Sequence, residues 1–400
     1  MTRWVHAIRH GWVVTDHVPG PDVDEFADAA EVVAALARSP SGDTLLAVQH
    51  PHRTPAARSG GLSLVDALPA ARRALDRLRA SAYRPVADVV APYRVQGPDG
   101  MAVGVLCLVD PAVVDSGGMS FVRHSEEVYP QVVAERAAVL AGLGCATSAA
   151  MLVPVSAGER LTAAASSSID VLGAPAVSTT DSGGRTHQLW LLGPGAAQDA
   201  VLAAVAGSPL LVADGNHRVA AAAVSERSAL LALVTAGPAL HIGAIHRALV
   251  GTGLRCDDLA TAWRRVGLAV REARGVGPPT QPGCVVARTR GGDLLVGLPE
   301  AGPDEPTPRI DHALVERLLI NDALGIDPEG SQVRALPAGH PTGPDVDVVV
   351  QLASVPFADV LAVHEQGRRM PRKSTYFTPK PRSGLLLADL TNPPALAQRR

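Results

Sequence analysis

The chain has 400 residues, which is too many for one small hydrophobic core, so two or three domains or one elaborated α/β unit are expected. Its 36 basic and 39 acidic residues give a net charge of −3, which argues against a nucleic-acid partner, because binding a duplex requires a basic patch. Apolar residues make up 47% of the chain and aromatic residues 3%, so the core should consist mainly of Val, Leu and Ala.

The amino terminus carries charges throughout and lacks the apolar stretch of a secretory signal. The most apolar region, residues 229–245, contains Gly237, Pro238 and Gly243, and is too short and too broken to span a membrane. The four cysteines are widely spaced and lie in apolar runs, as is typical of reduced core thiols: Cys107, Cys145, Cys256 and Cys284. A cytoplasmic protein without a membrane segment is therefore expected.

Short apolar runs alternate with helical patterns, which favours an α/β fold built on a mixed sheet. Helices are predicted at 25–38, 63–82, 130–143, 197–206 and 309–324. Strands are predicted at 44–50, 88–92, 102–109, 149–155, 186–192, 210–213 and 229–234, and a hairpin at 284–298 turns at Gly291-Gly292.

Linker-like segments occur at 275–283 and 300–308. They suggest four parts: an N-terminal α/β segment, a core domain, a C-terminal α/β domain and a disordered tail. The predicted boundaries are 1–84, 85–274, 275–391 and 392–400.

Lysine occurs only twice in the chain, at Lys373 and Lys380, and both lie within 370–384. Lysine carries a compact ammonium charge on a flexible side chain that can reach a phosphate, whereas the arginine guanidinium is planar and permanently charged. The two residues therefore do not substitute freely at a chemical site. The same segment offers the hydroxyls of Ser374 and Thr375 and is stiffened by prolines. It suits a lid on a phosphate-bearing ligand, and equally a structural strap over the core.

The sharpest local motif is an apolar strand that runs into Asp214-Gly215 and then into an alanine-rich helix starting at about His217. This geometry points backbone N–H groups and the positive end of the helix dipole at an anion. Arg218 could clamp a phosphate, Asp214 could hold a metal ion or accept a proton from a hydroxyl, and His217 could donate to a developing charge. An ordinary Asp-Gly turn before a helix is the alternative.

A second cluster, 122–130, contains His124, Glu126 and Glu127 before a helix. Its carboxylates could act as a general base or hold magnesium, or could simply favour the start of the helix. His187 and His246 are single strand histidines, and such residues more often belong to the core or the surface than to a metal site. Zinc spacings, a Walker-type phosphate loop and a nucleophile elbow are absent from the sequence.

Taken in order, these motifs resemble the bacterial and archaeal family known as domain of unknown function 1015. The family pattern contains a His-Glu segment, a His-x-Leu-Trp strand, an Ala-Asp-Gly-His-His-Arg turn, a Pro-x-His-Arg strand, Met-Pro-x-Lys-Ser-Thr-Tyr-Phe-x-Pro-Lys and Ser-Gly-Leu. The matching segments here are 124–136, 187–190, 213–218, 246–247, 370–380 and 383–385. The resemblance spans residues 85 to 390.

The turn also resembles that of ParB/sulfiredoxin-like proteins, which include nucleotide-dependent free-serine kinases. This resemblance implies a ParB/sulfiredoxin-like core in which the turn binds nucleotide phosphates and an upstream carboxylate serves the acceptor hydroxyl. Two departures occur. Asn216 replaces the first histidine of the family turn, and Ser125-Glu126-Glu127 replaces His-Glu-x-Thr, so either glutamate could be the equivalent carboxylate.

We therefore expect a phosphotransferase that uses Mg²⁺ and ATP or another nucleotide and acts on a small hydroxyl-bearing metabolite such as serine. Asp214 would contact the metal, with Glu126 or Glu127 as the base and His217 assisting. The phosphate ligands would be Gly215, Asn216, Arg218, Lys373, Ser374, Thr375 and Lys380. The alternatives are a nucleotide-gated ParB-like switch, with a self-complementary homodimer surface, and a small-molecule binding protein without catalysis.

Overall fold

The computed structural model describes residues 4–26, 29–39, 42–225, 229–237, 240–302 and 305–391. It divides into two compact units. The first comprises Met1–His124, Val128–Leu240 and Pro379–Arg400, and the second comprises Ser125–Glu127 and His241–Thr378. The predicted boundaries at residues 84 and 274 fall inside the first and the second unit, respectively. The tail predicted at 392–400 lies outside the described residues.

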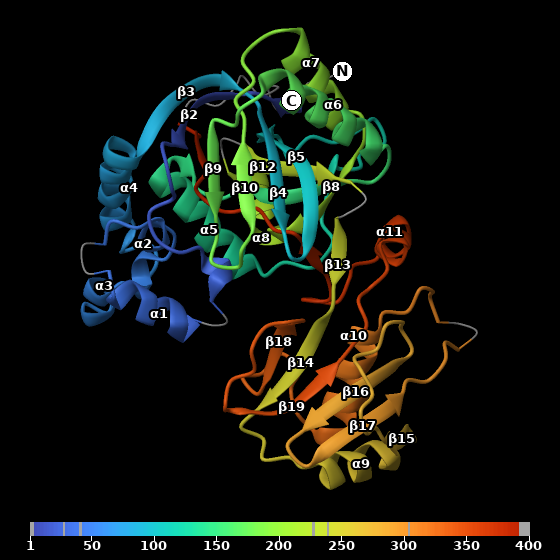
Figure 1. Ribbon diagram of the computed structural model, residues 1–400. Coiled ribbons are helices and arrows are strands. Elements are labelled where there is room, and N and C mark those ends of the chain that lie inside the picture. Colours follow the sequence, from blue (N-terminus) through green and yellow to red (C-terminus); the bar gives the residue numbers. More distant parts are fainter. Residues whose placement is uncertain are drawn as a thin grey trace. The chain divides into compact units, whose positions relative to one another are not determined.

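A nine-stranded mixed sheet forms the centre of the first unit (Figure 1). Its strand order is β6-β11-β8-β12-β5-β4-β10-β9, with β1 beside β5. The β6–β11 and β8–β12 pairs are parallel and the others antiparallel, which confirms the predicted mixed α/β class. The bounds are β1 Val5–His6, β4 Ala91–Gly97, β5 Gly100–Val109, β6 Val122–Arg123, β8 Ala150–Pro154, β9 Val177–Thr180, β10 Thr186–Leu189, β11 Leu210–Asp214 and β12 Leu230–Ala236.

Apolar side chains on both faces of this sheet form two cores, because residues alternate between the faces along each strand. One core packs under α6 (Gly158–Leu172) and α7 (Ala196–Ala206), which lie side by side in Figure 1. The other packs under α4 (Leu68–Ala82) and a four-stranded sheet of order β3-β2-β21-β7. The strands of that sheet are β2 Ile8–Val14, β3 Tyr83–Val89, β7 Cys145–Ala146 and β21 Leu386–Asp389.

The N-terminal helices correct one prediction. Residues 44–50 were predicted as a strand but form α2 (Leu45–Gln49), because the Thr44 hydroxyl caps the helix by accepting from the Ala47 N–H at 3.2 Å. A short apolar run has no periodicity that separates a buried strand from a buried helix. The neighbouring elements are η1 Val23–Glu25, α1 Ala29–Ala37, η2 Pro51–Arg53 and α3 Pro55–Ser59.

Two further helices of the first unit lie against each other: α5 (Pro130–Leu143) and α8 (Asn216–Val224). Helix α5 has the bounds that its apolar period predicts. Helix α8 follows β11 after a single residue, Gly215, as expected from the Asp-Gly turn.

The second unit is built on a six-stranded antiparallel sheet of order β15-β17-β16-β19-β14-β18. One face packs against α9 and the continuous α10–η3 helix, where the buried Trp263 donates its indole N–H to the Leu319 carbonyl at 2.9 Å. The predicted hairpin at 284–298 is β16–β17. The bounds are β14 Ile245–Val250, α9 Cys256–Arg265, β15 Ala269–Glu272, β16 Cys284–Thr289, β17 Gly292–Gly297, α10 Asp311–Leu314, the π-helix η3 Val315–Asp322, β18 Val333–Pro337 and β19 Val346–Gln351.

A two-stranded sheet stands where the chain enters and leaves the second unit. It pairs β13 (His241–Gly243) with β20 (Tyr376–Thr378), and His241 lies opposite Thr378. Helix α11 (Phe357–Glu365) precedes β20. Throughout the described residues, no helix is long and apolar enough to cross a membrane.

We predict that Gly384→Ala destabilises the first unit. Gly384 has φ +80°, and a Cβ there would collide with Leu45 Cδ2 and lie 3.0 Å from Val18 Cγ1. The left-handed backbone and the overpacking together should cost about 3 kcal/mol of unfolding free energy in urea titrations. Gly61→Ala is the control: Gly61 has φ +62° with open space around it, so we expect a loss of about 1 kcal/mol. Equal losses would contradict the packing argument.

Acid should weaken the second unit through His312, which is fully buried and donates from Nε2 to the Ile245 carbonyl. Burial lowers the pKa of His312 to about 3. The unfolded state therefore binds the extra proton first, so stability is full above the unfolded pKa of about 6.5 and falls as the pH drops below it. We expect a loss of about 2 kcal/mol from this group between pH 6.5 and pH 5.

The measurement is the unfolding free energy of the wild type, His312→Gln and His241→Gln across that range. His312→Gln retains an amide donor but takes up no proton, so its pH slope should be shallower. His241 is exposed in the same unit, so His241→Gln is the control for replacing a histidine outside the core. A wild-type slope retained in His312→Gln would contradict the assignment.

Candidate functional site

The strand-to-helix turn at the end of β11 is the centre of the site. Gly215 has φ +94°, and a Cβ at this position would lie 2.7 Å from Arg218 Nε, so glycine is required both by the backbone and by the guanidinium stacked on it. No side chain caps α8 at Gly215. The first turn of α8 therefore places backbone N–H groups and the positive end of the helix dipole at Gly215.

The structure brings together three of the residues singled out in the sequence: Asp214, Arg218 and Lys380. Arg218 Nη2 donates to Asp214 Oδ2 at 2.5 Å, and Lys380 Nζ contacts Asp214 Oδ1 at 3.3 Å, from 166 positions further along the chain. Arg218 Nη1 also donates to the Ala149 carbonyl at 2.7 Å. The Lys380 side chain is 19% exposed, so its charge is largely held within the protein.

Asp24 extends this group, and the sequence analysis had not singled it out. Its Oδ2 lies 3.8 Å from Lys380 Nζ, so Lys380 contacts two carboxylates. Burial raises the pKa of Asp24, and Lys380 opposes that rise while Asp214 and Asp22 add to it.

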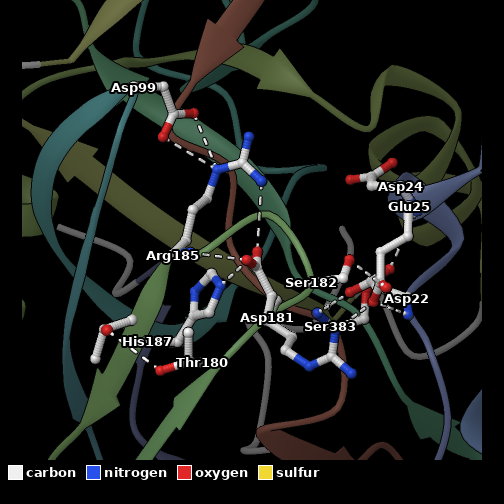
Figure 2. A network of polar contacts seen from close by, with 12 residues as sticks. Asp22, Asp24, Glu25, Asp99, Thr180, Asp181, Ser182, Arg185, His187 and Ser383 are labelled. Atoms are coloured by element: carbon white, nitrogen blue, oxygen red, sulfur yellow. Dashed lines mark hydrogen bonds and ion pairs between the residues drawn. The ribbon is translucent and has the colours of Figure 1, made fainter. Parts of the chain in front are cut away.

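The segment that carries Lys380 is fastened to the start of the chain. Arg382 donates to Glu25 Oε1 at 2.9 Å, and the Ser383 N–H donates to Asp22 Oδ2 at 2.6 Å. Asp22 and Glu25 themselves form a capping box around η1, which holds both carboxylates in place. Figure 2 shows Asp22, Glu25 and Ser383 meeting at this point, with Asp24 beside them.

A buried polar chain supports the same segment from the sheet. The Arg382 N–H donates to Tyr93 Oη, which is 2.6 Å from His187 Nδ1, and His187 Nε2 is 3.0 Å from Asp181 Oδ2. At the far end of this series of hydrogen bonds, Arg185 contacts both Asp181 and Asp99 (Figure 2). Burial lowers the pKa of His187, although Asp181 opposes this. His187 therefore acts as a hydrogen-bonded core residue.

Arginine side chains gather beside the turn. Burial lowers the pKa of Arg136 on α5, and the charges of Arg218 and Arg53 lower it further, with Glu135 opposing them. Arg136 makes no ion pair or side-chain hydrogen bond within the described ranges. His50, which is 8% exposed, lies near Arg53 and Arg136, and its pKa is lowered to about 3, first by burial and then by these charges. Arg53, Arg136 and Arg218 thus form a group of cations, of which Arg218 is paired with Asp214.

Two other residues of the turn contact the segment before α5. Asn216 Oδ1 is 3.2 Å from His124 Nδ1. His217 Nε2 accepts from the Tyr129 N–H at 3.1 Å, and the two rings stack 6.0 Å apart. Accepting this bond places any ring proton of neutral His217 on Nδ1. The contact therefore leaves Nδ1 as the nitrogen from which neutral His217 could donate.

The remaining predicted site residues belong to the second unit. The backbone of Glu126 forms an isolated β-bridge with that of Met370, and Glu127 is exposed. Lys373 is exposed with φ +50°, and its carbonyl accepts from the buried Arg247 at 3.1 Å. Ser374 is fully buried and donates to the Pro371 carbonyl, and Thr375 follows it half-buried. The two lysines are therefore anchored in different units.

A ready-made metal site is not apparent, because no group of three His, Cys, Asp or Glu residues that could hold an ion occurs within the described ranges. Both Asp214 oxygens contact cationic side chains. Sequence reasoning missed Asp24, Arg53 and Arg136 as site residues. The Asp22-x-x-Glu25 capping pattern was a signal for the first of these, whereas the arginines are ordinary helix-surface residues in the sequence.

Residues 83–269 match the model of the family described as "Protein of unknown function (DUF1015)". No curated protein matches the sequence. Among solved structures, a conserved hypothetical protein from Pyrococcus furiosus has a TM-score of 0.36 and 11% identity, covering 66% of this chain and 90% of its own.

Two further solved structures show a similar degree of likeness. A free serine kinase in complex with AMP has a TM-score of 0.36 and 11% identity, covering 64% of this chain and 83% of its own. SbnI from Staphylococcus aureus has a TM-score of 0.38 and 13% identity, covering 70% of this chain and 87% of its own.

We predict that Lys380→Met raises the pKa of Asp24 further, because it removes the cation that most opposes protonation and leaves Asp24 near Asp214. An NMR titration of the side-chain carboxyl signals measures the change. Arg73→Met, at an exposed position of α4, should leave that pKa unaltered. An unchanged Asp24 titration in Lys380→Met would mean that the two side chains are not coupled in solution.

Proposed function

We propose that this chain, which belongs to the DUF1015 family through residues 83–269, binds a nucleotide by its phosphates at the first turn of α8 in the first unit. The observation that carries the proposal is Arg136. Burial and the charges of Arg218 and Arg53 lower its pKa, and within the described residues no carboxylate forms an ion pair with it. Clustered like charges destabilise one another, and a polyanion relieves that repulsion.

The helix start supplies the rest of a phosphate site. Gly215 lets the backbone approach closely, and α8 begins there with the positive end of its dipole. Arg218 provides a planar guanidinium and Lys380 a compact ammonium charge. These are the residue types that cradle phosphates in proteins of unrelated fold.

We further propose that the activity is transfer of a phosphoryl group to a small hydroxyl-bearing metabolite, with serine as the first acceptor to test. Phosphoryl transfer depends mostly on positioning and charge neutralisation, together with one carboxylate that orients the hydroxyl. Asp24 is the carboxylate of the first unit that suits this role, because it adjoins Lys380 and its raised pKa makes it a stronger base. The roles predicted for Glu126, Glu127 and Lys373 remain predictions from sequence.

Mg²⁺ fits this site only together with the phosphates. The ion is usually held by one or two carboxylates plus substrate phosphates, and Asp214 and Asp24 are the carboxylates available here. Lys380 contacts both, so it would have to yield one of them. Bound Mg²⁺ would neutralise charge on the phosphates.

The engagement of both Asp214 oxygens by cations favours a second candidate, a protein that binds the nucleotide without chemistry and responds to it as a regulatory switch. In that case nucleotide binding persists while transfer is absent with every acceptor.

We predict that Mg²⁺-ATP stabilises the full chain and that Arg136→Ala and Lys380→Ala each weaken its binding about 10-fold, because each loses a charge-assisted contact. Calorimetric titration of the wild type and these variants measures this. Arg73→Ala is the matched arginine control and should bind like the wild type. Failure of ATP, GTP and AMP to bind the wild type would refute the proposal.

Phosphoryl transfer is tested by ³¹P NMR with serine as acceptor. At saturating Mg²⁺-ATP, Asp24→Asn should lose about 10²-fold in transfer rate, because general-base positioning is removed while the basic phosphate ligands are kept. Transfer at the wild-type rate in Asp24→Asn would exclude Asp24 from this role. Binding without transfer in the wild type would favour the switch.

A further inference from the structure

The six-stranded sheet of the second unit has a second face, opposite the one that packs against α9 and η3. Leu249, Val348 and Val350 point into the core beneath α9 and η3. Because side chains alternate along a strand, His246, Val349 and Gln351 point the other way. The side chains on this opposite face are more polar than those of the core.

A cavity of about 590 Å³ lies between this face and the loop that joins β18 to β19. Its lining includes His246, Arg288, Arg290, Leu336, His340 and Gln351. The volume falls within the range of small-molecule sites, roughly 300–1,000 Å³. Leu336 and the neighbouring Val349 supply an apolar floor, and the other five side chains supply polar groups.

His246 directs a fixed donor into the cavity. Its side chain is 5% exposed, and Nδ1 accepts from the Leu352 N–H at 3.2 Å, so the ring proton of neutral His246 resides on Nε2. No described residue forms a hydrogen bond with Nε2. Burial and the neighbouring Arg247 lower the pKa of His246, which keeps the ring neutral near pH 7. Because His246 lines the cavity, this N–H is available to an acceptor bound there.

Gln351 adds a second donor. Its Oε1 accepts from Arg288 Nε at 3.0 Å, which fixes the amide so that its NH₂ group faces away from Arg288. Arg288 is itself paired with Asp293, so it serves to orient Gln351 rather than to supply net charge. The Gln351 NH₂ has no partner among the residues the structure describes.

Arg290 brings a positive charge to the cavity, whose lining also contains the Asp347 carboxylate. One of its nitrogens donates to the Pro344 carbonyl at 2.7 Å, which holds the loop, and no ion pair involves Arg290 within the described ranges. The acidic side chain of the lining, Asp347, already accepts from the N–H groups of Thr252 and Gly253. The wall therefore offers several hydrogen-bond donors, and its carboxylate, Asp347, is already engaged by backbone N–H groups.

From this arrangement we infer that the second unit carries a separate binding site for a small organic oxyanion, in which a carboxylate or phosphate accepts from His246, Gln351 and Arg290. The apolar body of the ligand packs on Leu336 and Val349. The site is independent of the nucleotide site proposed at α8, since every residue that forms it belongs to the second unit.

The test is an NMR titration of the full chain, labelled with ¹⁵N in histidine, using benzoate and phenyl phosphate as probes. Each probe joins one small apolar ring to one oxyanion. We expect a saturable shift of the His246 Nε2 signal. Arg290→Ala and Gln351→Leu should each weaken the binding that this signal reports about 10-fold, as for loss of a hydrogen bond to a charged group. Arg271→Ala, an exposed arginine of β15, should bind like the wild type.

The two probes distinguish the sources of the oxyanion. A response to benzoate alone identifies a carboxylate ligand, a response to phenyl phosphate alone identifies a phosphate ester, and a response to both supports an oxyanion site of either kind. No shift of His246 with either probe overturns the inference, as does a shift that persists unchanged in both variants. Phosphate binding at α8 cannot imitate the result, because the readout is the His246 signal and its loss in Arg290→Ala.

Discussion

The first unit depends on the return of the C-terminal segment to the start of the chain. Arg382 and Ser383 bind the carboxylates of the η1 capping box, and β21 pairs with both β2 and β7 in the small sheet. The same segment delivers Lys380 to Asp214. Because the capping box, the small sheet and the lysine contact all use one short stretch of backbone, the site at α8 cannot be complete before the last part of the chain has folded.

The sequence predicted the elements with strong local signals and missed those defined by distant partners. Helix α5 has its predicted bounds because a helical apolar period and a proline start it clearly, and the turn at Gly215 follows from Asp-Gly before an alanine-rich helix. The strand predicted for residues 44–50 was wrong because the Thr44 hydroxyl caps a helix there. Strand β21 was missed because a short apolar run becomes a strand only beside β2 and β7.

The candidate site shows the same division. Lys380 was identified from the sequence because lysine is so rare in this chain. The structure places its ammonium group beside Asp214. Asp24 and Arg136 could not be identified in this way, because an aspartate after a capping residue and an arginine on a helix are common. Their significance comes from what surrounds them: a lysine shared by two carboxylates and three guanidinium groups near one another.

The pairing of His241 with Thr378 has a consequence for the order of folding. Residues 241–378 begin and end with the two paired strands of one small sheet. Once this segment has folded, Leu240 and Pro379 are therefore neighbours in space. Closing an unfolded loop of that length costs on the order of 4 kcal/mol in chain entropy. Prior folding of the second unit removes most of that cost, and it presents the C-terminal strand to the first unit as a nearly local segment rather than a distant one.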